Sequence, residues 1–114
     1  MAIEVLYTQI ACADLKRSTI WYARLFGRAP DARPMKGLAE WRHGASAGLQ
    51  LFENAANAGH GTLTLVVSSL REERARLDKA GLAPGEVEAA ASNSLVRLRD
   101  PDGNLVVLAE PGRV

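Results

Sequence analysis

An internal repeat constrains the fold of this chain more than any other feature of its sequence. Residues 14–16 fall on residues 69–71 at a shift of 55, and residues 49–53 fall on 106–110 at a shift of 57. Few residues are identical, but the predicted elements follow the same order in both halves. This pattern is typical of a duplicated structural module.

The first half predicts a strand, a helix and two further strands. Residues 3–12 are rich in β-branched and apolar types and predict a strand. Asp14 offers a helix N-cap and Gly27 a left-handed helix end, so we expect a helix between them. A connection with a short edge strand follows at 28–37, and strands are expected at 38–43 and 49–53.

The second half repeats this order after a polar linker at 54–61. A strand is expected at 62–67, and the capping-box pair Ser69 and Glu72 begins a second helix that Gly81 ends. The last strands, at 94–99 and 105–110, are joined by a type I turn at 100–103. Because one helix covers only one face of such a sheet, we expect the two modules to enclose a cavity between their open sheet faces.

Composition and charge bound the function. The 114 residues are 47% hydrophobic and 24% charged, which is ordinary for one globular domain. A net charge of +1 favours neither nucleic acid nor an anionic membrane as a partner. No segment approaches the roughly 20 apolar residues of a spanning helix. Cys12 is the single cysteine, so we expect a cytoplasmic, reducing location.

Two motifs carry a family resemblance. They are Ala13-Asp14-Leu15 with Ser18 and the segment 21–27 (Trp-Tyr-x-x-Leu-Phe-Gly), and the closing hairpin 100–104 (Asp-Pro-Asp-Gly-Asn) with 105–111. With them, the whole chain resembles the vicinal oxygen chelate superfamily of glyoxalases, bleomycin-resistance proteins and extradiol dioxygenases. The resemblance implies an α+β fold in which two βαβββ modules curl a mixed sheet around a central pocket. Residues 1–114 would form one domain, with modules at about 1–54 and 62–114.

The resemblance also implies four metal-ligand positions, two in each module. Carried over by position, they fall on Tyr7, Gln50, Thr62 and Val107. Val107 has no lone pair to donate, and the other three side chains are neutral, whereas divalent ions prefer imidazole, thiolate or carboxylate ligands. We therefore expect no metal and no other cofactor, although an atypical site that uses His43 or His60 stays open.

Strand alternation assigns side chains to the expected pocket. The candidate ligand-binding residues are Tyr7, Gln9, Glu40, Gln50, Phe52, Thr62, Thr64, Arg97 and Val107. Glu40 and Arg97 could form a charge pair that either links the modules or binds ligand. Cys12 faces the helix and Trp41 the core. No catalytic set is visible, and the catalytic residues stay unknown.

Three functional hypotheses remain. The first is a metal-free protein that sequesters or senses a small organic molecule, for which Arg97 would suit a carboxylate or phenolate. The alternative is a superfamily enzyme (a lyase, isomerase or dioxygenase) with an atypical or metal-independent site. The third is an interaction subunit. We expect a homodimer, with Trp21 as the interface anchor.

Overall fold

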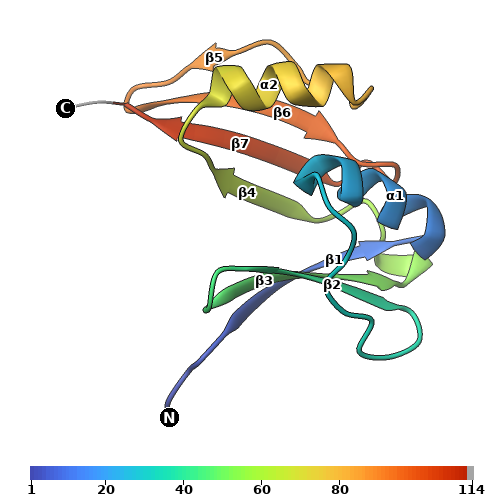
Figure 1. Cartoon of the computed structure of the whole chain (residues 1–114). Coiled ribbons are helices and arrows are strands. Elements are labelled where there is room, and N and C mark those ends of the chain that lie inside the picture. Colours follow the sequence, from blue (N-terminus) through green and yellow to red (C-terminus); the bar gives the residue numbers. More distant parts are fainter. Residues whose placement is uncertain (113–114) are drawn as a thin grey trace.

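The computed structural model describes residues 1–112 (Figure 1). The first half contains β1 (Leu6–Cys12), α1 (Leu15–Phe26), β2 (Leu38–His43) and β3 (Ala47–Glu53). A short 3-10 helix, η1 (Ala55–Asn57), leads into the second half. That half contains β4 (Thr62–Val66), α2 (Leu70–Lys79), β5 (Glu88–Ala89), β6 (Asn93–Arg99) and β7 (Leu105–Pro111).

Local capping and turn signals position most of these elements. The Asp14 carboxylate accepts a hydrogen bond from the Arg17 backbone N–H at 3.2 Å, and Gly27 ends α1 at φ 72°. Ser69 Oγ accepts from the Glu72 N–H at 3.3 Å and begins α2. These predicted helix ends are confirmed: the Asp14 and Ser69 side chains satisfy N–H groups that the helices leave unpaired, and Gly27 adopts the left-handed backbone conformation.

Two strand starts and two short strands differ from the prediction. β1 begins at Leu6 rather than at residue 3, and β3 begins at Ala47. The expected edge strand within 28–37 is reduced to an isolated bridge between Ala32 and Glu40. The short strand β5 was not predicted, since two residues are too few to produce an alternating pattern.

The strands form two separate sheets with matching topology. The first sheet has the order β1-β3-β2 and the second the order β4-β7-β6-β5. In each sheet the first strand pairs in parallel with the last strand of its module, and the remaining pairs are antiparallel. The predicted α+β fold of two repeated modules is confirmed, but the two sheets do not close around a pocket.

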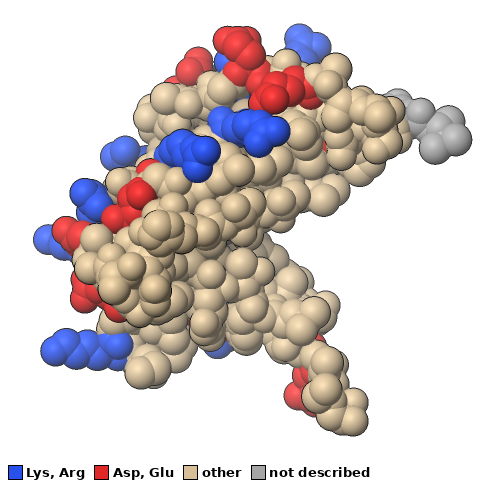
Figure 2. All heavy atoms as spheres, turned by 180° about the vertical axis from the view of Figure 1, so that it is seen from behind, with Lys and Arg blue, Asp and Glu red and all other residues tan. Residues whose placement is uncertain are grey.

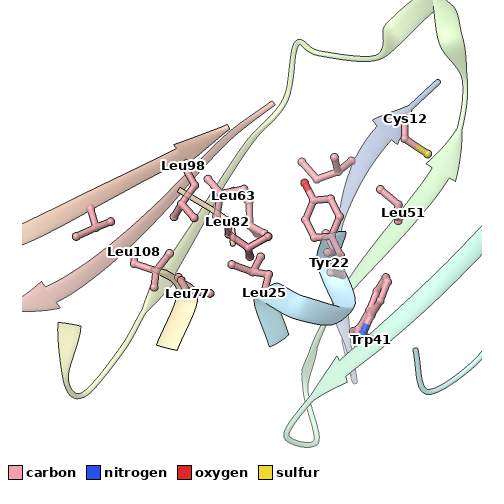
Figure 3. Packing of buried hydrophobic residues seen from close by; sticks show 14 of the residues in the cluster. Cys12, Tyr22, Leu25, Trp41, Leu51, Leu63, Leu77, Leu82, Leu98 and Leu108 are labelled. Carbon is pink, nitrogen blue, oxygen red and sulfur yellow. The ribbon is translucent and has the colours of Figure 1, made fainter. Parts of the chain in front are cut away.

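The modules pack through the sheet faces that carry the helices. Figure 3 shows side chains of both sheets converging on Tyr22 and Leu25 of α1. Trp41 is fully buried on this side, as predicted. The expected cavity between open faces therefore does not form within one chain, because the apolar stripe of α1 is buried by both sheets at once. Each buried leucine contributes about 1.5–3 kcal/mol to this arrangement, and the open faces point away from each other.

The closing hairpin joins the two modules. The buried Asp100 carboxylate accepts from Tyr22 Oη in α1 at 2.8 Å and from Asn104 Nδ2 at 2.8 Å. Asn104 is also buried; it donates to the Ala11 carbonyl at 3.0 Å and accepts from the Gly61 N–H at 2.8 Å. One side chain thus satisfies the backbone of β1 and of the segment that enters β4.

Candidate functional site

The open face of the first sheet brings together the five first-module residues of the predicted site. The strand register places Gln9, Gln50 and Glu40 in one row across β1, β3 and β2. In the row beside it, Tyr7 and Arg42 both pair with Gly48. The row on the other side holds Ala11, Phe52 and Leu38.

Glu40 is the centre of a hydrogen-bond network on this face. Its side chain is almost fully buried, with 3% of the residue exposed. Gln50 Nε2 donates to Oε1 at 2.9 Å, while Tyr7 Oη and Arg42 Nε donate to Oε2 at 3.2 and 2.9 Å. Gln9 Nε2 donates in turn to Gln50 Oε1 at 2.9 Å.

These donors keep Glu40 ionised. The hydrogen bond from Gln50, together with those from Arg42 and Tyr7, holds the pKa of the Glu40 carboxyl below its usual value, although burial opposes this shift. A buried carboxylate without such partners would be strongly destabilising. The network therefore holds its side chains in fixed positions on an otherwise open sheet face.

Gly48 allows Tyr7 to reach Glu40. The Tyr7 ring lies over β3, and a Cβ at Gly48 would lie 2.6 Å from Tyr7 Cε1. Any other residue would push the ring away from the sheet, because real Cβ atoms do not approach so closely. The missing side chain at Gly48 thus sets the orientation of an aromatic surface that is 39% exposed at Tyr7.

The second-module candidates lie on the open face of the second sheet. Val107 pairs in register with Thr64 and with Arg97, and Thr62 lies on the same face of β4. Arg97 Nε donates to Glu88 at 2.9 Å, and this ion pair is about half exposed. The possible charge pair between Arg97 and Glu40 does not form within one chain, because Arg97 pairs with Glu88 and Glu40 with Arg42.

The four positions implied for a metal do not fit a divalent ion. Tyr7 and Gln50 lie on one open face, and Thr62 and Val107 lie on the other. The set offers a phenol, an amide, a hydroxyl and a hydrocarbon, without one anionic ligand. Within residues 1–112, no three His, Cys, Asp or Glu side chains are placed to hold a metal ion.

The histidines do not replace the missing ligands. The His43 ring packs on Phe26 at 4.6 Å between ring centroids, and burial and the nearby Arg28 lower its pKa. His60 is exposed in the linker.

Sequence reasoning missed one residue of the site, Arg42, although the two-residue period of β2 places it on the same face as Glu40.

Cys12 gives a direct check of the core. It is fully buried, as predicted, and burial and the Asp102 charge raise the pKa of its thiol to about 11. We expect the native protein to resist iodoacetamide at pH 8 and to react in urea, as measured by intact mass. The thiol of an unfolded chain has a pKa of about 8.5, so the unfolded state loses its proton before the folded state does. The free energy of unfolding should therefore fall as the pH rises from there toward 11. Rapid labelling of the native chain would contradict this burial.

A groove of about 640 Å³ separates the two sheets on their helix-bearing side. It appears as the deep notch in Figure 2. Its lining includes Thr8, Phe26, His43, Leu65 and Arg76, which lie outside the predicted site, and Thr64, which belongs to it. The groove opens between β1 and β4, each of which has one edge without a strand partner in the described part of the chain.

Comparisons with known proteins agree with this architecture. No curated protein matches the sequence. Within residues 1–112, the structure has no helix that is long and apolar enough to span a membrane. A glyoxalase / bleomycin resistance protein from Catenulispora acidiphila has a similar structure, with 27% identity and a TM-score of 0.87 over 94% of this chain and 97% of that one.

Two further solved structures share the fold. TnmS3, an antibiotic binding protein from a Streptomyces species, is 23% identical with a TM-score of 0.84, over 98% of this chain and 99% of that one. The bleomycin resistance determinant encoded on transposon Tn5 is 19% identical with a TM-score of 0.78, over 93% and 96%. The model of the glyoxalase-like domain matches residues 7–109. The chain therefore belongs to the glyoxalase-like domain family, within the vicinal oxygen chelate superfamily.

Proposed function

We propose that this protein binds a small organic molecule on the open face of its first sheet, without a metal. The observation that carries the proposal is the network centred on Glu40. An ionised, buried carboxylate held by Tyr7, Arg42 and Gln50 on a helix-free sheet face is costly, and a stable sheet does not require it. A few polar groups held beside aromatic surface are typical of small-molecule sites.

We further propose that a second copy of the chain completes the site. In one chain the candidate residues of the two modules face in different directions, so each open face is half of a pocket. The free edges of β1 and β4 carry exposed apolar side chains, including Leu6 at 67% and Val66 at 70% exposure. Pairing of these edges between copies would cover that surface and bring a first-sheet open face beside the partner's second-sheet open face.

The basis for a homodimer differs from the one expected from the sequence. Trp21, the predicted anchor, is half-buried and packs edge-on against Tyr22 of its own chain at 4.9 Å between centroids. The exposed edges of β1 and β4, rather than Trp21, are the surfaces we propose for the interface. The names of two structural neighbours, an antibiotic binding protein and a bleomycin resistance determinant, support a sequestering role. A cytoplasmic location belongs to the same proposal, since it suits a buried, unpaired cysteine.

A thermal-shift screen of aromatic antibiotics and metabolites, with and without a chelator, tests this function. We expect at least one compound to raise the melting temperature in the presence of EDTA, because ligand binding stabilises the folded state. Gln9→Trp should abolish that shift, since it places a bulky ring on the exposed row beside Gln50. The matched control Ala45→Trp, at an exposed turn, should retain it. Hits that all disappear with EDTA would favour the superfamily-enzyme alternative.

A further inference from the structure

We infer that Arg42 recognises an anionic oxygen, a carboxylate or phenolate, on a flat aromatic ligand, and that Glu40 is the residue that positions it. This inference rests on the proposed function and specifies the ligand class of the same face. Three observations support it: the hydrogen bonds around Glu40, the position of the Arg42 backbone and the neighbouring aromatic surface.

The hydrogen bonds of the Glu40 network leave N–H donors free to bind a ligand at this face. Both oxygens of Glu40 are occupied, and the side-chain oxygen of Gln50 accepts from Gln9. Arg42 uses Nε in its bond to Glu40, and the Tyr7 hydroxyl also lies beside the guanidinium, whose two terminal nitrogens make no other hydrogen bond among residues 1–112. The Arg42 side chain is 58% exposed, so these nitrogens are accessible to a ligand. Two N–H groups in one plane match the two oxygens of a carboxylate.

The backbone at Arg42 is held in place as well. Its N–H donates to the Asp31 carboxylate at 2.6 Å, and its carbonyl accepts from Arg28, which also pairs with Asp31. Anchoring of both the main chain and Nε restricts the plane of the guanidinium. A preorganised cation loses less conformational entropy when it binds an anion.

The aromatic surface lies beside this cation. Tyr7 and Arg42 lie on either side of Gly48, which has no side chain to separate them. A flat ring stacked on Tyr7 would therefore place an acidic substituent next to the guanidinium. A cationic ligand is disfavoured, because Glu40, the only acid in these three rows, is already paired with Arg42.

The test compares two probes of the same shape, 2-naphthoate and neutral 2-naphthamide. Dissociation constants are measured by NMR titration of the ¹⁵N-labelled protein at pH 7. We expect the wild-type protein to prefer naphthoate by about tenfold, which is the usual effect of a hydrogen-bonded charge. Arg42→Gln should reduce the preference to about equal affinity. Arg33→Gln, which removes the same charge from an exposed loop, should preserve it.

Glu40→Gln tests the positioning role. The Arg42 Nε–H signal should lose its hydrogen-bonded shift, and the preference for naphthoate should fall while naphthamide affinity stays unchanged. A purely structural role would weaken both probes equally and would overturn this assignment.

Other outcomes separate this inference from the proposed function. Equal affinities in the wild-type protein, or a preference lost with Arg97→Gln but not with Arg42→Gln, would overturn the inference. Neither result affects hits from the thermal-shift screen. Failure of both probes to bind also overturns the inference, whereas failure of the whole screen overturns the proposed function.

Discussion

Asn104→Ala should lower the free energy of unfolding by about 4 kcal/mol, a large share of the total stability of a domain this size. The substitution leaves the partly buried Gly61 N–H and the buried Ala11 carbonyl without their partner, and it removes one of the donors to Asp100. Each unpaired buried group costs about 1–3 kcal/mol. Urea unfolding followed by tryptophan fluorescence measures the change directly.

A matched substitution separates this effect from the loss of an asparagine in general. Asn57→Ala, at an exposed position in η1, should change stability by less than about 0.5 kcal/mol. Equal, small losses in the two variants would mean that Asn104 does not join the modules.

Val66→Asp should convert the proposed dimer into a monomer. The side chain is 70% exposed on the free edge of β4, and a two-fold interface would bury the new charge twice. We expect the dissociation constant of the dimer to rise about a thousandfold, the equivalent of about 4 kcal/mol. Sedimentation velocity at micromolar concentrations measures the change.

The control makes the same chemical change away from the strand edge. Val87→Asp alters a side chain that is 54% exposed before β5, and it should leave the dimer intact. A wild-type protein that sediments as a monomer at tens of micromolar would contradict the shared site, as would a Val66→Asp variant that remains a dimer.

Local sequence signals predicted the elements of this fold well. Asp14, Ser69 and Gly103 act on backbone groups within four residues, so their effect is visible without tertiary structure. The repeat predicted the matching topology of the two sheets, and the closing hairpin pairs Arg97 with Val107 as expected.

The packing of the modules could not be predicted in the same way. Strand alternation separates a helix-bearing face from an open face but does not say which pair of faces meets within one chain. The linker at 54–61 can span about 26 Å and permits either arrangement. The helix-bearing faces meet because α1 buries Tyr22 and Leu25 against both modules, a long-range contact that no local pattern encodes.

The same limit applies to the candidate site. Alternation correctly grouped Tyr7, Gln9, Glu40 and Gln50 on one face, since strand periodicity is local. It also suggested a charge pair between Glu40 and Arg97, which does not form within one chain, because that suggestion assumed a cavity enclosed by both modules. The nearer partner Arg42, two residues along the same strand, was overlooked for the same reason.

Mixing two blocked variants tests most directly whether the site is shared between two chains. Gln9→Trp blocks the first-sheet face and Thr64→Trp the second-sheet face, and both positions are exposed, so folding should not suffer. Neither variant alone should bind a wild-type ligand from the screen. An equal mixture, unfolded and refolded together, should recover about a quarter of the wild-type sites by calorimetry, because half of the dimers then contain one unblocked pair of faces. No recovery in a mixture shown to contain heterodimers, or full binding by Thr64→Trp alone, would contradict a site built from two chains.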